Sequence, residues 1–400
     1  MIMSKLEDLI LDKCPKGVVF KRLNDLGSFY GGLSGKTKED FSNGNSKYIT
    51  YMNVFSNISV NTKVQDKVKI DHKERQNLVK YGDVLFTGSS ENPSECGISS
   101  VVTDSVSEEL YLNSFCFGFR FFQSNLFNPE FLKYLFRSDS LRKQINKTAS
   151  GVTRFNVSKK KMGSVLIPIP PLEVQQEIVR ILDNFTELTA ELTAELTARR
   201  KQYFHYRKFL LKKMDNFQKH YLGEVATLKT GSKPKGILDL PNLYEYINAG
   251  TTNSGFTDIS NCVGDTVTTP SRGQGGIGFV GYQNKPFWLG PLCYRIRSRD
   301  INVVTNRYLF HYLSCFNEKI LTLKKEGGTP SVNMFDLVNI EIDIPPLDEQ
   351  AQIVSILDRF DTLVNDIKQG LPAEIAARQK QYEYYRDKLL TFNEVGDESI

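Results

Sequence analysis

The amino-acid sequence predicts an α+β protein in which two similar globular domains are separated by two long antiparallel α-helices, as a pseudo-two-fold internal repeat. Two observations support this fold class: a long segment recurs within the chain, and both copies carry apolar residues at helical spacing. The length of 400 residues exceeds one ordinary domain, and 40% apolar residues are enough to form a core in each.

The clearest repeat begins at a proline pair. Ile169-Pro170-Pro171-Leu172 returns 175 positions later as Ile344-Pro345-Pro346-Leu347, and 12 of 20 aligned positions are identical. Ala198 to Leu211 matches Ala377 to Leu390 at 9 of 14 positions. Average residue frequencies give roughly one or two matches per window by chance. The chain is therefore a duplication.

The repeat divides the chain into variable and shared segments. The middles of the variable segments, 40–125 and 240–300, show no convincing similarity to each other. The expected boundaries are a first globular domain with a short N-terminal helix at 1–168, a first long helix at 169–214, a second globular domain at 215–343, a second helical region at 344–393 and a tail at 394–400.

Each shared segment is expected to start a helix at its proline pair, because proline suits the first helical position. The apolar spacing is typical of a coiled-coil seam, and a helix over 172–211 would be about 60 Å long. Its apolar stripe must pack against a partner, most simply the other copy. Gly370-Leu371-Pro372 should break or kink the second helix. The expected seam residues are Ile178, Leu182, Phe185, Leu192, Leu196, Tyr203 and Tyr206, and in the second copy Ile353, Leu357, Phe360, Val364, Tyr382 and Tyr385.

The first helix contains a four-residue repeat of its own, Thr189-Ala190-Glu191-Leu192 followed by Thr193-Ala194-Glu195-Leu196. Alanine, glutamate and leucine are strong helix formers, so an inert stretch of helix also explains it. As an adjustable element, each unit would add about 6 Å to one helix of the pair.

Charge and cysteine content narrow the class of protein. Residues 1–170 carry 24 Lys and Arg against 17 Asp and Glu, whereas 344–400 carry 6 against 11. A basic excess permits nucleic-acid binding, but a mildly basic solvated surface explains it equally well. No apolar run approaches 18 residues, so no membrane span is expected. The six cysteines are widely spaced, which favours a reducing, cytoplasmic location over a disulfide scaffold or zinc site.

No motif predicts a catalytic or metal site. The segment 31–37 resembles a phosphate-binding loop but fails its spacing at Tyr30, and the glycines of 273–278 precede a predicted strand rather than a helix. Asn128-Pro129-Glu130-Phe131 lacks the second proline of an amino-methyltransferase motif, and helix capping explains it. The four histidines are isolated.

Three features of the sequence resemble the specificity subunit of type I restriction–modification systems, and look closest to the subgroup with spacer repeats. They are the shared segments, the Thr-Ala-Glu-Leu repeat, and the helix ending Arg199-Arg200-Lys201-Gln202-Tyr203 with Tyr206-Arg207. The resemblance implies a non-catalytic subunit with two target-recognition domains, each reading one half of a split DNA sequence. It also implies a circular arrangement, in which joining Leu390 to the N-terminus would give both domains the same flanks.

The same resemblance implies the partners. Two modification subunits would dock on the helical regions, bind S-adenosylmethionine and methylate adenine, and a further ATP-dependent subunit would translocate and cut unmethylated double-stranded DNA. We therefore expect no cofactor on this chain, with S-adenosylmethionine, ATP and Mg²⁺ held by the partner subunits.

Candidate DNA-binding residues follow from side-chain chemistry, because basic side chains contact phosphates and polar side chains read bases. Expected base readers lie in the equivalent loops 150–156 and 327–333, namely Thr153, Arg154, Asn156, Ser331 and Asn333, together with the guanine-type reader Arg272 and the adenine-type reader Gln274. Expected phosphate contacts are Lys36, Lys47, Arg142, Lys143, Lys147, Lys159, Lys160 and Lys161 in the first domain and Lys233, Lys235, Lys324 and Lys325 in the second. A solvated lysine or a glycine turn remains the alternative at each position.

Two other functions remain open at this stage. One is a duplicated coiled-coil scaffold for protein assembly that never binds DNA, and the other is a self-contained DNA-modifying enzyme with an unrecognised active site. Salt-sensitive binding to a specific duplex distinguishes the DNA reader from the scaffold. Methyl transfer by the chain alone would favour the enzyme.

Overall fold

The computed structural model describes residues 2–212, 217–239, 243–366 and 369–395. The chain forms two compact units, unit 1 from 1–191 and 376–400 and unit 2 from 192–375. We call the part of each unit outside the long helices its head. Each of the two helical regions is divided between the units, whereas the expected boundaries assigned each helical region to one undivided segment. The expected segment ends at 213–214 and 396–400 lie outside the described residues.

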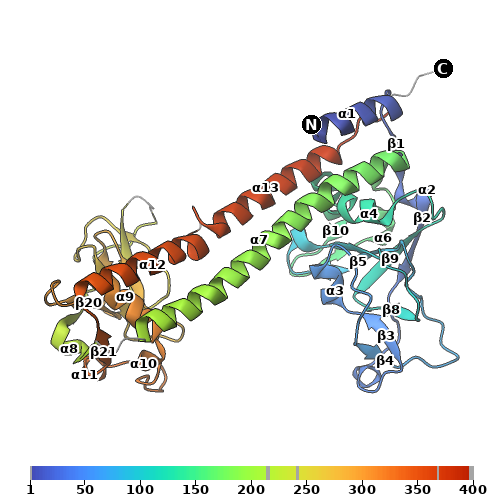
Figure 1. Cartoon of the computed structure of the whole chain (residues 1–400). Helices are drawn as coiled ribbons and strands as arrows, with labels where there is room; N and C mark the ends of the chain where they lie inside the picture. Colours follow the sequence, from blue (N-terminus) through green and yellow to red (C-terminus); the bar gives the residue numbers. More distant parts are fainter. Residues whose placement is uncertain (1, 213–216, 240–242, 367–368, 396–400) are drawn as a thin grey trace. The chain divides into compact units, whose positions relative to one another are not determined.

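The head of unit 1 contains four small sheets (Figure 1). Their strand orders are β2-β9-β5-β7, β1-β12, β4-β3-β8 and β10-β11-β6, and the only parallel pair among these described strands is β3 with β8. The strands are β1 Val19–Arg22, β2 Gly27–Gly31, β3 Ser46–Ile49, β4 Lys67–Val68, β5 Val84–Thr87, β6 Ser89–Ser90, β7 Ser99–Val101, β8 Leu110–Leu112, β9 Cys116–Phe121, β10 Ala149–Ser150, β11 Phe155–Val157 and β12 Leu166–Ile169.

The head of unit 2 repeats three of these sheets strand for strand. The orders are β14-β20-β17-β18, β13-β21 and β16-β15-β19, and β15 again pairs in parallel with β19. The strands are β13 Gln218–Tyr221, β14 Ala226–Thr230, β15 Tyr244–Ile247, β16 Phe256–Thr257, β17 Thr266–Pro270, β18 Gly281–Gln283, β19 Trp288–Leu289, β20 Cys293–Ser298 and β21 Glu341–Ile344. The duplication therefore extends through the middles of the heads, where the two sequences show no convincing match.

Short helices complete each head. Capping side chains fix two of them, because Asn128 and Thr305 accept hydrogen bonds from the first turns of α4 and α9. This confirms capping as the role of the segment that resembles a methyltransferase motif. The helices are α1 Ile2–Lys13, α2 Leu23–Leu26, α3 Tyr51–Ser56, α4 Pro129–Leu135, α5 Asp139–Asn146 and α6 Lys159–Met162 in unit 1, and α8 Leu222–Val225, α9 Asn306–Cys315, α10 Glu318–Leu321 and α11 Met334–Leu337 in unit 2.

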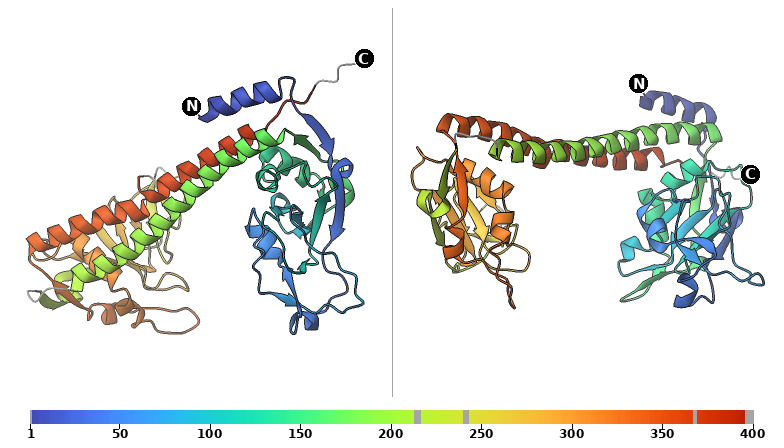
Figure 2. Two further views of the ribbon diagram at one scale, coloured as in Figure 1. Left: turned by 45° about the vertical axis from the view of Figure 1, so that its right-hand side comes forward. Right: turned by 60° about the horizontal axis from the view of Figure 1, so that its bottom comes forward.

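The long helices match their expected bounds closely. The first, α7, runs over Leu172–Lys212, one residue beyond the expected end. The second region forms α12 Leu347–Asn365 and α13 Leu371–Leu389, which confirms the predicted break; it lies before Leu371, and Pro372 stands in the first turn of α13. In unit 2 the α7–α12 pair is antiparallel, since Arg200 donates to the Val364 carbonyl while Tyr206, further along α7, stacks on Phe360. In unit 1, α13 lies beside the N-terminal part of α7 (Figure 2).

In each unit, the seam residues of the long helices are part of the hydrophobic core of that unit's own head. In unit 1, Ile178 and Leu182 of α7 are fully buried in one cluster with Phe86, Phe119 and Leu389. In unit 2, Ile353, Leu357 and Val364 of α12 share a cluster with Leu196, Tyr203 and the head residues Ile296 and Tyr308. Burying each apolar stripe against its own head fixes that part of the helix pair.

The two ends of the described chain meet in unit 1. The Val18 amide donates to the Asn393 carbonyl (2.8 Å), and the Val395 amide donates to the Val18 carbonyl (3.1 Å). Leu6 of α1 is buried in the same cluster as Leu389, and Lys13 lies 3.4 Å from Glu173 of α7. These contacts place the segment that follows α13 beside the start of the first head, as the circular arrangement of the repeat predicts.

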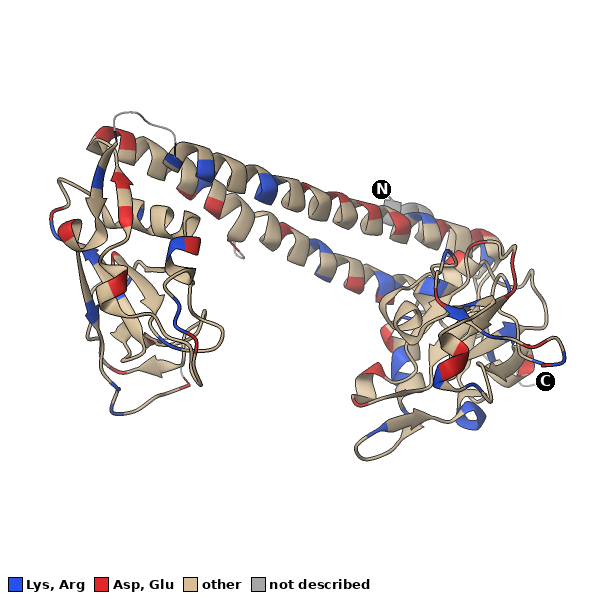
Figure 3. Cartoon of the chain, turned by 90° about the horizontal axis from the view of Figure 1, so that it is seen from below, with Lys and Arg blue, Asp and Glu red and all other residues tan. Residues whose placement is uncertain are grey.

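Within the described residues, no helix is long and apolar enough to cross a membrane. All six cysteines are buried and free, so none forms the disulfide scaffold that their spacing argued against. In the view of Figure 3, basic and acidic residues are interspersed over both heads, whereas along α7 the acidic residues all precede Arg199 and the basic residues, apart from Arg180, lie from Arg199 onward.

Candidate nucleic-acid interface

The expected reading loop of unit 1 is the tip of a hairpin. Strands β10 and β11 pair antiparallel, and β11 pairs on its other side with β6, which aligns Asn156 with Ser89. Gly151 sits at the turn with φ +153°, and a Cβ there would lie 2.0 Å from the Arg154 carbonyl oxygen. Only glycine fits this position, because other residues rarely adopt that conformation. The turn leaves Val152 91% exposed and Thr153 exposed.

Arg154 is held in place although it is exposed. Its Nε donates to Ser89 Oγ (3.1 Å), and its guanidinium carbon lies 5.6 Å from the centre of the Phe115 ring. Phe115 is itself 57% exposed, and the Phe115 carbonyl accepts a hydrogen bond from the Gly88 amide. Sequence reasoning did not find Ser89 or Phe115, because nothing in the sequence signals that these distant positions meet the hairpin.

A short basic helix follows the hairpin. In α6, Ser158 caps the N-terminus by accepting from the Lys161 amide, and the fully buried Met162 anchors the opposite side. Lys159, Lys160 and Lys161 are all exposed, and the Lys159 ammonium lies 6.0 Å from the centre of the Phe117 ring. Three positive charges therefore lie immediately after the reading loop in the chain.

Unit 2 brings together two loops that the sequence separates by more than fifty residues. Arg272 forms a β-bridge with Ser331, the Gly273 amide donates to the Pro330 carbonyl (3.0 Å), and the Val332 amide donates to the Ser271 carbonyl (2.9 Å). Arg272 and Gln274 are exposed on one side of this junction. The two groups of expected base readers in unit 2, 272–274 and 331–333, thus form one surface.

Five expected phosphate contacts take part in ion pairs, and four of these lysines are partly or fully exposed. Such exposed pairs contribute little, about 0–1 kcal/mol, so a phosphate can replace the carboxylate at small cost. The hydrogen bond that Lys143 donates to Asp139, together with the negative charge of Asp139, raises the pKa of Lys143. The pairs of these four lysines are Lys47–Glu108 (2.8 Å), Lys143–Asp139 (2.5 Å), Lys324–Glu326 (2.9 Å) and Lys325–Asp336 (2.9 Å).

Two expected contacts have structural roles instead. Lys36 is only 6% exposed and pairs with Glu74, whose pKa the Lys36 hydrogen bond lowers to about 2. Arg142 donates to the carbonyls of Ser94, Cys96 and Gly97, and burial lowers its pKa to about 10. Neither cation faces solvent as a phosphate contact must, so neither prediction is retained.

The other candidates are exposed, except Ser331, which is partly buried. Among the described residues, Lys147, Lys160, Lys161, Lys233 and Lys235 have no ion-pair partner. Asn156 and Asn333 are also exposed, at equivalent positions of the two heads. These residues remain predicted DNA contacts.

The helix seam forms one aromatic stack that recurs in both units. Phe185 stacks on Tyr385 in unit 1 (ring centres 5.3 Å apart), and its repeat equivalent Phe360 stacks on Tyr206 in unit 2 (6.0 Å). Tyr206 is 43% exposed despite this contact. The remaining seam residues are buried or partly buried, namely Ile178, Leu182, Leu192, Leu196, Tyr203, Ile353, Leu357, Val364 and Tyr382.

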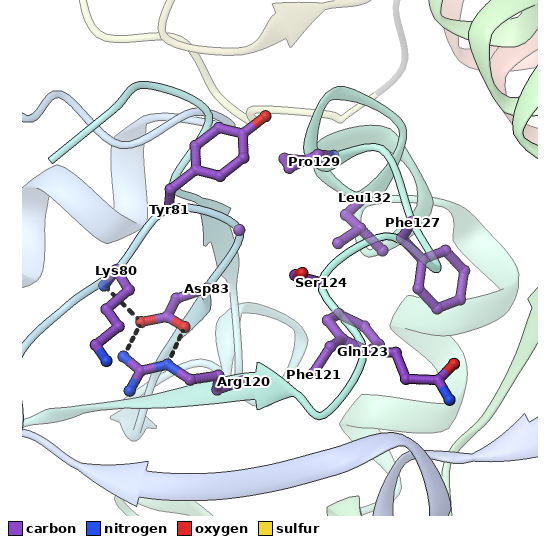
Figure 4. A pocket seen from close by; sticks show the side chains of 11 residues that line it. Lys80, Tyr81, Asp83, Arg120, Phe121, Gln123, Ser124, Phe127, Pro129 and Leu132 are labelled. Atoms are coloured by element: carbon purple, nitrogen blue, oxygen red, sulfur yellow. Dashed lines mark hydrogen bonds and ion pairs between the residues drawn. The ribbon is translucent and has the colours of Figure 1, made fainter.

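Unit 1 contains a pocket with a volume of about 180 Å³, whose charged side chains Asp83 and Arg120 bond to one another and have a structural role (Figure 4). Its charged wall is Asp83, 1% exposed, which accepts two hydrogen bonds from Arg120 and one from the Tyr30 hydroxyl. Burial, followed by the charge of Asp83, raises the pKa of Tyr30. These groups satisfy one another, and the described residues contain no cluster of metal-ligating side chains.

The fold and this surface define a class of protein: a duplicated chain with two α+β heads, each presenting a polar hairpin junction with exposed cations. Comparison with known families identifies it further. The model of the type I restriction modification DNA specificity domain matches the chain twice, at residues 15–199 and 214–377. The chain therefore belongs to this family, and membership implies a non-catalytic role in DNA recognition.

Individual relatives agree with this assignment. A putative type I restriction enzyme specificity subunit of Haemophilus influenzae is 37% identical over 61% of this chain and 68% of its own length. A type I restriction enzyme specificity subunit of Escherichia coli is 34% identical over 59% of this chain and 64% of its own. The solved structure of the type I restriction-modification S subunit from M. genitalium has the same fold, with a TM-score of 0.57 and 16% identity over 93% of this chain and 96% of that one.

Proposed function

We propose that each head reads one half of a bipartite double-stranded DNA target, and that the helical regions set the spacing between the halves. The observation that carries this proposal is a junction that recurs in both heads, where a strand segment meets a hairpin, closed by β10 and β11 in unit 1 and by the antiparallel Lys325–Ser331 bridge in unit 2. Arg154 is exposed at the first junction and Arg272 at the second. The remaining exposed lysines are suited to phosphate contacts, which position a protein without reading sequence.

Two modification subunits would dock on the helices. Leu188 of α7 and its repeat equivalent Leu363 of α12 are identical and apolar, yet 45% and 39% exposed. An apolar side chain left exposed at the same place in both copies suits two identical partners. S-adenosylmethionine, ATP and Mg²⁺ would be held by partner subunits, including a restriction and translocase subunit, in a cytoplasmic complex. The Thr-Ala-Glu-Leu units would place the chain in the subgroup with adjustable spacers.

Binding measurements on the full chain with its modification subunits test the recognition role. The target is first obtained by mapping methylated adenines in the host genome. We expect scrambling either half-site to reduce affinity to the non-specific level, and added salt to weaken binding steeply, because cations on the protein displace counterions from DNA. Equal affinity for target and scrambled duplexes would favour the protein scaffold instead.

Charge substitution tests the docking role. Leu188→Glu and Leu363→Glu should each remove one modification subunit, and the double variant both, as measured by the mass of the assembled complex. Glu187→Gln, at an exposed neighbour of Leu188, is the control and should leave the mass unchanged. Retention of two partner subunits by the double variant would rule out this surface.

A further inference from the structure

The hairpin junctions of the two heads carry an arginine and a serine in exchanged positions. In the repeat, Arg154 aligns with Ser331, because Gly151 and Asn156 face Gly328 and Asn333 at the same offset of 177. In unit 1 the hairpin therefore supplies the arginine, and the contacting residue Ser89 comes from β6.

The equivalence of Ser89 and Arg272 follows from strand register. Val84 of β5 pairs with Phe119, and Val267 of β17 pairs with Ile296, which lies 177 positions after Phe119. Counting five residues onward from each valine reaches Ser89 in unit 1 and Arg272 in unit 2. In unit 2 the hairpin thus supplies Ser331 and the facing strand segment supplies Arg272; the backbone pairing is shifted by two residues, because Ser89 pairs with Asn156 whereas Arg272 pairs with Ser331.

Each junction therefore exposes one arginine. The hairpin carries this arginine in unit 1, and the facing strand segment carries it in unit 2. In unit 1 the Ser89 hydrogen bond holds Nε and the Phe115 ring lies under the guanidinium. Neither terminal nitrogen of Arg154 has a hydrogen-bond partner among the described residues, and the same holds for Arg272. A guanidinium fixed at Nε with two free terminal nitrogens offers a planar pair of donors.

This geometry suits one base above the others. Guanine presents two acceptors, N7 and O6, at its major-groove edge, and arginine pairs with both at once. A phosphate contact needs only a flexible positive charge, which the exposed lysines 159–161 already supply in unit 1. We propose that Arg154 and Arg272 each read a guanine, one in each half of the target; this inference rests on the proposed function.

Base preference at single positions tests the proposal. The full chain, assembled with its modification subunits, selects binding sites from duplexes randomised at each position of the two half-sites. We expect Arg154→Ala to reduce the preference for guanine at one position of one half-site by roughly tenfold to a hundredfold. Arg272→Ala should do the same in the other half-site, with the remaining positions unchanged.

Two further variants separate base reading from charge and from folding. Arg154→Lys retains the charge, so binding should persist while the guanine preference weakens, because an ammonium lacks the planar fork. Lys160→Ala, the matched control, should weaken binding to all sequences equally and reduce its salt dependence.

Three outcomes are decisive. If Arg154→Ala and Arg154→Lys leave every base preference intact, or weaken all duplexes alike, the arginine contacts phosphate and the inference is wrong. If the altered position prefers a base other than guanine, the assigned chemistry is wrong. Failure of the unsubstituted complex to prefer any sequence would instead contradict the proposed function itself.

Discussion

Phe185 of α7 stacks on Tyr385 of α13 with ring planes 21° apart, and the repeat places Phe360 on Tyr206 in the same way with planes 24° apart. Neighbouring residues repeat as well, since Arg386 lies over Tyr382 as Arg207 lies over Tyr203. Each unit thus builds its helix pair from one part of each helical region, which explains why both regions are retained in the duplicated chain.

A double-mutant cycle tests the stacking. Phe185→Ala and Tyr385→Ala should each destabilise unit 1, and their coupling should be about 0.5–1.5 kcal/mol, the range measured for aromatic pairs. Denaturant unfolding followed by circular dichroism measures it. The control cycle, Phe185→Ala with Tyr206→Ala, joins residues that are not partners and should give a coupling near zero. Equal coupling in both cycles would show that the stacks are not specific.

One buried glutamine in the first turn of α7 and one in the first turn of α12 should each be essential for stability. Gln175 accepts from the Asn128 amide and donates to the Leu126 and Pro170 carbonyls, and Gln350 makes the same three contacts with Thr305, Val303 and Pro345. Replacement of either by leucine removes the partner of three backbone groups, in one buried and two partly buried hydrogen bonds, and should cost about 2–4 kcal/mol of unfolding free energy. Gln176→Leu, at an exposed position, is the control and should change stability by less than about 0.5 kcal/mol. A similar loss in all three variants would contradict this role.

Stability of unit 2 should fall in mild acid because of His311. This imidazole is fully buried with Nε2 2.6 Å from Asp358, and burial lowers its pKa below 6.5 despite that hydrogen bond. As pH falls through 6.5 the unfolded chain binds a proton that the folded chain does not, so the free energy of unfolding decreases down to the folded-state pKa.

The carboxylate of Asp358 adds a second step at lower pH. Burial raises its pKa, but the hydrogen bonds from His311 and Arg307 outweigh burial and leave the pKa below 3.8. Stability is therefore lost again as pH falls below 3.8. His311→Gln should flatten the dependence between about pH 7 and about pH 5, measured by denaturant unfolding at each pH. An unchanged slope in that variant would show that another group titrates.

Comparison of sequence and structure shows where prediction succeeds. The bounds of α7 and the break before Leu371 follow from local rules, namely proline at a helix start, apolar spacing, and glycine with proline at an interruption. The burial of Arg142 does not follow from such rules, because its charge is stabilised by carbonyls of 94–97, which are distant in sequence. The sequence also does not predict the Ser89–Arg154 contact, because that contact depends on the pairing of β6 with β11.

Deletion of Thr193-Ala194-Glu195-Leu196 tests the proposed spacing role. These residues lie within the continuous helix α7, so the deletion removes about 6 Å of helix, or one to two base steps of about 3.4 Å. We expect a shorter unread spacer, most simply by one base pair, with both half-sites unchanged. Mapping of methylated adenines measures this, and a change in the recognised bases would contradict the role.

Exchange of one head tests the central claim most directly, namely that two independent readers lie on one duplicated chain. Residues 40–160 are replaced by the corresponding segment of a relative, and the methylated sequence is read from genomic DNA of cells carrying the hybrid chain with its modification subunits. The account predicts a new sequence in one half of the target and an unchanged sequence in the other. A change in both halves would contradict it.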